Sequence, residues 1–236
     1  MSKVYSKGSV KLFLGDCFKL IKTIPDNSVD LIFTDPPYSN TNYYNQISNY
    51  KKEVLAREFK RVLKITGNLV LFCGMYCKWD WYNVLSKYLK FHQELVWYYK
   101  NSSKIRCVSR KFVPAHETLL WFTKSDKFYF KKQIPFGFTV IEHHTFSGFL
   151  RGYEGLPKEK IGATAKPLKI AEIIVDRLCP EDGMVLDTFA GTGTFAIACK
   201  KLGKKYIGFE IDEKWFTLAK ERIEKHKTDA SILDYK

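Results

Sequence analysis

The sequence predicts an α/β fold in which a doubly wound, mixed but mostly parallel sheet carries helices on both faces. Strand-like apolar runs alternate with helix-like runs along most of the chain, which is typical of such a sheet. A strand, a glycine turn and a helix follow one another over residues 184–202. The 236 residues are 45% hydrophobic, enough to bury a full core, so we expect one domain over 1–236 with a small insertion.

The expected elements follow from the length and pattern of these runs. Short apolar runs predict strands over residues 11–15, 30–34, 68–73, 94–99, 117–123, 184–187 and 205–209. Longer amphipathic runs predict helices over residues 17–23, 51–64, 79–90, 168–178, 194–202 and 213–226. No long helix separates the runs at 94–99 and 117–123, which favours an antiparallel hairpin at one edge of the sheet. Residues 131–165 are rich in Gly, Phe and polar side chains and are expected to be a loop or an insertion.

The segment Asp35-Pro36-Pro37-Tyr38 directly follows the second expected strand. Proline ends a strand because it lacks an amide donor and fixes φ, so Asp35 is delivered to the carboxyl end of a buried strand, where ligands bind in open α/β sheets. The prolines stiffen the turn and leave their carbonyl oxygens as acceptors. Such a segment also fits an ordinary turn, but acceptors beside the Tyr38 ring suit a flat ring that carries an amino group.

A glycine turn follows the strand that ends at Asp187, in the run Thr188-Phe189-Ala190-Gly191-Thr192-Gly193-Thr194. Glycines let the backbone approach a ligand closely, and the N-terminus of the next helix offers amide donors to a negative group. Glu210 ends the following strand, where an acid binds ribose hydroxyls in several cofactor classes. By itself this pattern equally fits a dinucleotide loop or a tight turn without a ligand.

Together, the two segments resemble the β-class DNA amino-methyltransferases, which transfer a methyl group from S-adenosylmethionine to an amino nitrogen of adenine or cytosine. The resemblance covers most of the chain and includes the order of its parts, with Asp35 to Tyr38 early, Lys166-Pro167 opening a later helix, and the glycine loop last. It implies that Asp35, Pro36, Pro37 and Tyr38 form the catalytic segment and that residues 131–165 recognise the target. The cofactor-binding residues that it implies are Asp16, Cys17, Asp35, Lys166, Asp187, Phe189, Ala190, Gly191, Thr192, Gly193, Thr194, Glu210 and Ile211.

The resemblance also implies a substrate and a mechanism. Asp at the first motif position goes mainly with adenine N6 in this family, and Ser with cytosine N4, so Asp35 favours adenine; cytosine N4 and RNA stay open. Asp35 and the Pro36 carbonyl would each accept a proton of the amino group and turn its lone pair toward the methyl donor. Tyr38 would stack on a base flipped out of the duplex. The alternatives from other classes are a nicotinamide-dependent oxidoreductase and a non-catalytic DNA-binding relative.

The charge balance fits a polyanionic partner. The formal net charge is +14 and the pI is about 9.4. Many lysines fall on amphipathic helices, where a solvated face explains them. One basic cluster follows an aromatic strand and is predicted to bind DNA: Lys100, Lys104, Arg106, Arg110 and Lys111. The expected partner is double-stranded DNA, and the family resemblance adds a cognate restriction endonuclease and a second copy of the chain as further candidate partners.

Cysteine spacing and hydropathy argue against a metal site, disulfides, a membrane span and a signal peptide. The six cysteines include no Cys-x-x-Cys pair, so buried thiols are expected rather than a metal site or disulfides. No apolar stretch is long enough to cross a bilayer, and the N-terminal residues have no signal-peptide core, so a cytoplasmic protein is expected.

Overall fold

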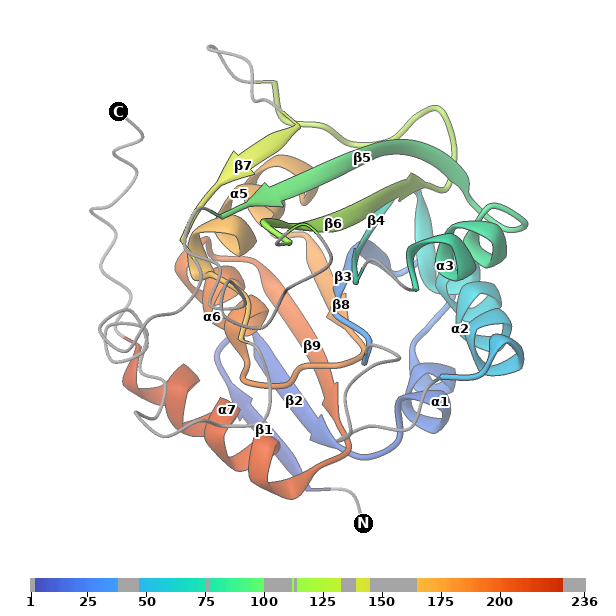
Figure 1. The fold of residues 1–236 in the computed structure, drawn as a ribbon. Helices are drawn as coiled ribbons and strands as arrows, with labels where there is room; N and C mark the ends of the chain where they lie inside the picture. The colour runs from blue at the N-terminus through green and yellow to red at the C-terminus, as the bar shows by residue number, and fades with distance from the viewer. Residues whose placement is uncertain are drawn as a thin grey trace.

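The fold is a sheet covered by helices on both faces, seen in a computed structural model (Figure 1). The structure describes residues 3–37, 47–74, 77–99, 112, 114–132, 139–144 and 165–226. Tyr38 and the predicted DNA-binding residues Lys100, Lys104, Arg106, Arg110 and Lys111 lie outside these ranges. Within them, nine strands form one sheet in the order β1-β2-β9-β8-β3-β4-β6-β5-β7.

The centre of the sheet is parallel, and antiparallel pairing occurs towards both edges, including the side where the hairpin was predicted. The strands are β1 (Val4–Lys7), β2 (Val10–Leu14), β3 (Val29–Thr34), β4 (Leu63–Cys73), β5 (Lys90–Tyr98), β6 (His116–Thr123), β7 (Val140–Glu142), β8 (Met184–Asp187) and β9 (Lys205–Glu210). Strands β2, β9, β8, β3 and β4 run parallel to one another. Strand β6 pairs antiparallel with both β4 and β5, which confirms the expected hairpin.

The helices form two layers that enclose separate cores. They are α1 (Cys17–Leu20), the 3-10 helix η1 (Ile21–Thr23), α2 (Asn49–Val62), α3 (Lys78–Leu85), α5 (Leu168–Leu178), α6 (Thr194–Lys201) and α7 (Glu213–Lys225). Helices α5, α6 and α7 pack on one face of the sheet, and α1, α2 and α3 pack on the other. Because side chains of a strand alternate between faces, Phe33 and Phe72 join the α5 layer while Ile32 and Leu71 join the α2 layer.

Several predicted boundaries were wrong, each for a local reason. The helix expected over 79–90 ends at Leu85, and residues 90–93 begin β5, where pairing with β6 overrides the weak pattern of an exposed polar stretch. Strand β1 was missed because Tyr5 is its only buried side chain, and its pairing with β2 fixes it. Strand β7 falls inside the segment expected to be a loop and pairs parallel with β5. Helix α2 ends at Val62, and β4 follows without a loop.

The sheet has a topological switch point between β3 and β8. Strand β8 continues through α6 to β9 on one side, while β3 continues through α2 to β4 on the other side. The two strands pair directly, with Leu31 opposite Val185 and Ile32 opposite Leu186. Their carboxyl ends therefore lie side by side, and the chain leaves them toward helices on opposite faces. In open α/β sheets, ligands bind at such a switch point, in the crevice outside the strand ends.

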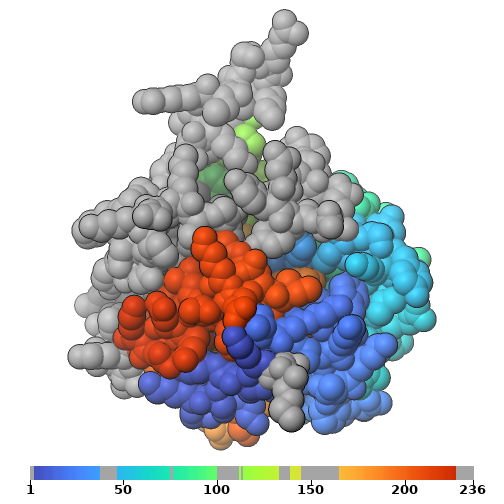
Figure 2. Space-filling model, turned by 90° about the horizontal axis from the view of Figure 1, so that it is seen from below, coloured from blue at the N-terminus to red at the C-terminus, as the bar shows by residue number. Residues whose placement is uncertain are grey.

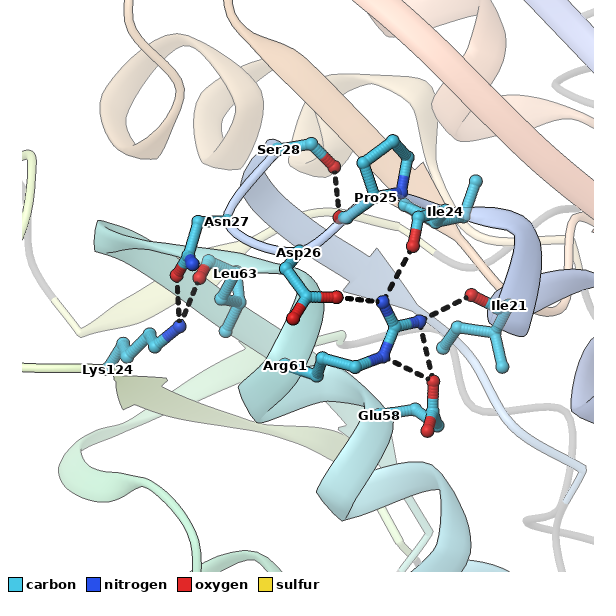
Figure 3. Close-up of polar contacts among 10 residues, drawn as sticks. All are labelled: Ile21, Ile24, Pro25, Asp26, Asn27, Ser28, Glu58, Arg61, Leu63 and Lys124. Atoms are coloured by element: carbon cyan, nitrogen blue, oxygen red, sulfur yellow. Dashed lines mark hydrogen bonds and ion pairs between the residues drawn. The ribbon is translucent and has the colours of Figure 1, made fainter.

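A network around Arg61 lies near the amino end of β3, at the opposite end of the sheet from the carboxyl ends just described (Figure 3). The guanidinium group donates to the carbonyl oxygens of Ile21 and Ile24 at 2.9 and 2.8 Å. It also contacts Glu58 at 2.7 Å and Asp26 at 2.5 Å. These bonds join the last turn of α2 to the segment that leads into β3, and so fix the position at which β3 begins.

The first described residues and the last helix, α7, lie side by side on one face. Figure 2 shows α7, in orange-red, side by side with the blue N-terminal strands, and Lys3 forms an ion pair with Glu213 at the start of α7. Strands from the early and late parts of the chain form one continuous sheet, so the Asp35 segment and the glycine loop follow neighbouring strands of that sheet. No helix in the described ranges is both long and apolar enough to cross a membrane.

Candidate functional site

The glycine loop between β8 and α6 is shaped by two left-handed residues. Gly191 and Gly193 have φ values of 49° and 76°, a region that side chains other than glycine rarely adopt. A Cβ atom on Gly193 would lie 2.9 Å from Cβ of Ala219, so the loop touches the backbone of α7 at this point. At Gly191, by contrast, a Cβ atom would meet, among the described residues, only the Phe189 carbonyl oxygen at 3.9 Å. The loop is thus anchored on α7 at Gly193 and has space beside Gly191.

Arg222 of α7 holds this loop from behind. Its guanidinium donates to the Thr192 carbonyl oxygen at 2.5 Å and to Thr194 Oγ1 at 3.2 Å, and the side chain is buried. Sequence reasoning missed this residue because it treated the basic residues of α7 as a solvated face. The available signal was its position, since Arg222 falls on the buried stripe of α7 with Trp215, Ala219 and Ile223.

Asp187 is turned into the protein at the end of β8. Its Oδ1 accepts bonds from Thr34 Oγ1 and the Phe189 amide, both at 3.0 Å, and its Oδ2 accepts one from Tyr206 at 3.1 Å. Burial raises the pKa of Asp187 to about 7, although these three bonds oppose the shift. The carboxylate therefore joins the ends of β3 and β8 to Tyr206, near the start of β9, and sets the start of the glycine loop. Thr34 and Tyr206 are functional supports that sequence reasoning did not identify.

Acidic groups line the carboxyl ends of the neighbouring strands. Glu210, at the end of β9, accepts the amides of Gly191 at 2.7 Å and Asp212 at 2.9 Å, and burial raises its pKa. Asp16 follows β2 and caps α1 by accepting the Phe18 amide at 2.9 Å. With Asp35 after β3, three carboxylates stand at this edge of a chain whose net charge is +14. Such an edge suits a ligand that carries positive charge.

The other predicted cofactor residues lie at the same edge with different exposure. Ile211 follows Glu210 and is 68% exposed, so it offers an apolar surface to a ring. Ala190, Thr192 and Thr194 are buried in the loop and at the start of α6, and Phe189 is half-buried. Cys17 is buried in the first turn of α1, and desolvation there raises its pKa to about 12, so the thiol stays protonated.

Asp35 lies at the centre of the site and pairs with a buried cation. The Lys166 ammonium contacts Asp35 Oδ2 at 2.7 Å and Glu117 Oε2 at 3.4 Å, and it lies 5.2 Å from the centre of the Phe72 ring. Burial lowers the pKa of Lys166, but the charges of Asp35 and Glu117 outweigh this effect and the pKa is raised. Pro36 is buried and Pro37 is half-buried beside them. Glu117 lies near the start of β6.

The fold thus brings most of the predicted site together. The segment from Asp35 to Pro37, Lys166, the glycine loop, Glu210 and Asp16 all lie at the carboxyl edge around the switch point. The Gly191 amide is already bound to Glu210, so a carboxylate occupies a donor that a dinucleotide pyrophosphate would use. This arrangement fits a cationic cofactor better than a nicotinamide dinucleotide.

Comparisons with known proteins agree with this geometry. A family model described as DNA methylase matches residues 29–221. The Type II methyltransferase M.HinfI of Haemophilus influenzae is 29% identical, over 93% of this chain and 70% of its own length. The crystal structure of the M1.HpyAVI–SAM complex is similar at a TM-score of 0.73 and 25% identity, covering 91% of this chain and 98% of that one. The cytosine-N4-specific PvuII DNA methyltransferase shares the fold at a TM-score of 0.73 with 17% identity, covering 93% of this chain and 90% of that one.

Proposed function

Because this chain belongs to the DNA methylase family, we propose that it is a site-specific DNA methyltransferase that uses S-adenosylmethionine and modifies adenine N6. One observation carries the proposal. The Asp35 carboxylate is held at the carboxyl end of β3, at the switch point and beside the glycine loop. A proton-accepting group and a cofactor loop therefore face the same crevice. The relatives support a Type II activity that acts at a specific DNA site.

The residues at the crevice fit S-adenosylmethionine. When bound, this cofactor supplies an electrophilic methyl group on a positively charged sulfur. Glu210 and Asp16 would accept hydrogen bonds from its ribose and adenine ends, and Ile211 would cover the adenine ring. Gly191 leaves room for the chain of the ligand to pass close to the backbone. Asp187 stays inside the protein in this proposal and positions the loop instead of touching the ligand.

The chemistry assigned to this chain begins with the amino group of the base. Its lone pair is delocalised into the ring, so the amino nitrogen is a weak nucleophile. Asp35 and the Pro36 carbonyl oxygen would each accept a hydrogen bond from one amino N–H, which turns the lone pair out of conjugation and toward the methyl carbon. Bound S-adenosylmethionine would supply the methyl group to this nitrogen in one displacement, in which the carbon–sulfur bonding pair would stay on sulfur. The methylated nitrogen releases one proton, which Asp35 accepts and passes to water.

Positioning of the reacting atoms accounts for much of the expected acceleration of methyl transfer. Reacting atoms held about 3–3.5 Å apart gain a large effective concentration. No nucleophile of the chain needs to form a covalent bond, and the buried, protonated Cys17 is unsuited to do so. Tyr38 is proposed to stack on the flipped base, a contact worth about 1–3 kcal/mol. Adenine is proposed over cytosine because Asp, not Ser, opens the motif.

Transfer of a labelled methyl group tests the proposal directly. Purified protein is incubated with tritiated S-adenosylmethionine and defined duplex DNA, and the DNA is then digested to nucleosides and separated. Label in N6-methyl-2′-deoxyadenosine is the expected result. Label only in N4-methylcytosine, or only in RNA offered in parallel, would replace the substrate assignment, and the absence of any label with bound cofactor would overturn the enzymatic one.

A further inference from the structure

Three adjacent strands place side chains around Lys166. Asp35 follows β3, Phe72 lies near the end of β4, and Glu117 lies at the start of β6. Because β6 is antiparallel to β4, with Thr118 opposite Cys73, the start of β6 reaches the same sheet edge as the end of β4. Phe33, Phe72 and Leu119 all face the α5 layer, and by strand alternation Asp35 and Glu117 share that face. Lys166 stands just before α5 and projects into this group.

The geometry of the ion pairs is unequal. Lys166 is closer to Asp35 Oδ2, at 2.7 Å, than to Glu117 Oε2, at 3.4 Å, and only 4% of its side chain is exposed. The Asp35 and Glu117 side chains are 22% and 19% exposed, so all three charges are largely withdrawn from water. A buried ion pair gains little stability over an apolar contact of similar size. The placement at the ligand edge therefore calls for a role other than holding α5 to the sheet.

We propose that Lys166 and Glu117 act as positioning residues for Asp35, and this inference rests on the proposed function. Lys166 fixes the rotation of the Asp35 carboxylate and keeps it ionised, so that it accepts an amino proton of the base. Glu117 also contacts the Lys166 ammonium, so the positive charge of Lys166 is divided between two carboxylates and does not cancel the negative charge of Asp35. The three groups together carry one net negative charge, which balances the positive charge that develops on the amino nitrogen as the methyl group arrives.

This role differs from the one that the family resemblance implies for Lys166, namely cofactor binding. Separate measurements of cofactor affinity and of the chemical step therefore distinguish the two. The variants are Lys166→Met, which removes the charge but keeps most of the side-chain volume, and Lys166→Arg, which keeps the charge. The matched control is Lys64→Met. Lys64 pairs at 2.8 Å with Asp30, a buried carboxylate near the start of β3, whereas Asp35 follows the end of β3.

The expected result is a loss in the chemical step alone. In single-turnover methylation, Lys166→Met should be slower by about 10²–10³-fold, while calorimetry shows a dissociation constant for S-adenosylmethionine within about threefold of the starting protein. Without the cation, one of the two remaining carboxylates takes up a proton at higher pH. The acid limb of the rate profile should therefore move to higher pH, and alkaline buffer should restore part of the rate. Lys166→Arg should recover much of it, and Lys64→Met should match the starting protein.

Glu117→Gln separates the two positioning residues. It removes the sharing partner but leaves the ion pair, so we expect a smaller loss, about tenfold, without the upward shift of the acid limb. The inference is overturned if Lys166→Met reacts as fast as Lys64→Met, or if its defect lies in cofactor affinity with an unchanged pH profile. Thermal melts identify any variant that fails to fold, in which case Lys166→Arg and Glu117→Gln decide. The proposed function fails separately, if the unsubstituted protein transfers no methyl group to DNA.

Discussion

At the scale of single residues, Asp35 is the group on which the proposed chemistry depends. Asp35→Asn keeps the shape of the side chain but replaces one acceptor oxygen with a donor, which opposes the amino protons of the base. We expect the single-turnover rate to fall by about 10²–10⁴-fold with little change in affinity for S-adenosylmethionine. The control Asp30→Asn removes a buried carboxylate from the other end of β3 and should leave the rate unchanged. Comparable turnover in Asp35→Asn would remove Asp35 from the mechanism.

Gly193 tests how closely the loop must approach α7. Gly193→Ala places a methyl group 2.9 Å from Cβ of Ala219 at a residue with φ of 76°, so it carries both a backbone and a packing cost. We expect a loss of about 2–5 kcal/mol in the free energy of unfolding in urea, together with weaker cofactor binding. Gly203→Ala is the matched control, because Gly203 has φ of 66° and nothing within 4 Å. Its expected cost is about 1–2 kcal/mol; equal losses would mean that contact with α7 is unimportant.

Asp187 predicts a pH dependence of stability. Burial raises its pKa in the folded protein to about 7, above the ordinary aspartate value of 3.8, so the folded state binds more protons than the unfolded state between these values. Stability contributed by the protonated form is therefore lost as pH rises from about 4 to 7, by on the order of 3–4 kcal/mol. Asp187→Asn does not titrate. In urea unfolding, the difference in stability between variant and parent should change across this window, and parallel curves would contradict the pKa shift.

The residue-scale picture also shows what the sequence could indicate about the site. Asp35 and the glycine loop were predictable because each combines rare residue types at a strand end, and the fold places both at the switch point. The supports were not predictable in the same way. Thr34 and Arg222 act through contacts 153 and 30 residues away in the chain, and no local pattern encodes such a contact. Only the position of an arginine on an apolar helical stripe marks Arg222.

At the scale of elements, the strongly periodic segments were predicted and the weakly patterned edges were not. Strands β3, β4 and β8 are buried on both faces and read as continuous apolar runs. Strands β1 and β7 have few buried side chains, so pairing with a neighbour fixes them. The start of β5 exposes residues 90–93, and its register against β6 overrides the sequence pattern. Tertiary pairing thus decided the elements that local propensity left open.

Arg61 gives a testable link between elements. Lysine at this position cannot reproduce the forked contacts to Glu58 and the two carbonyl oxygens, so Arg61→Lys should lose about 1–2 kcal/mol of stability in urea unfolding. Arg57→Lys changes an exposed residue one turn earlier on α2 and should stay within about 0.5 kcal/mol. Since the network lies at the edge opposite the site, cofactor affinity should be unchanged in both. An equal effect of the two substitutions would show that the network adds nothing.

At the scale of the whole molecule, charge is unevenly distributed. The chain carries a formal net charge of +14, yet Asp16, Asp35 and Glu210 stand together at the carboxyl edge of the sheet. A positive net charge attracts a polyanion, and the carboxylates at this edge attract a cationic donor, so charges of opposite sign attract the two proposed substrates. The order of the chain produces this arrangement, because its early and late halves supply adjacent strands of one sheet.

The basic cluster predicted from the sequence leads to a measurable salt dependence. If Lys100, Lys104, Arg106, Arg110 and Lys111 contact phosphates, replacing all five with Gln should weaken DNA binding and flatten its dependence on salt. Each phosphate contact contributes about 0.9 to the slope of log K against log salt, so the slope should fall by up to about 4.5. Fluorescence anisotropy with duplex DNA at several salt concentrations measures this slope, and cofactor affinity should not change.

A second set of lysines separates specific contacts from general attraction. Lys214, Lys220 and Lys225 lie exposed on α7, and we expect them to be solvated rather than bound to DNA. Replacing them with Gln lowers the net charge without removing phosphate contacts, so the slope should change by less than about 0.5. If each charge removed from α7 reduces the slope as much as each charge removed from the basic cluster, then overall charge alone attracts the DNA. A flattened slope only in the five-residue variant would place the phosphates along residues 100–111.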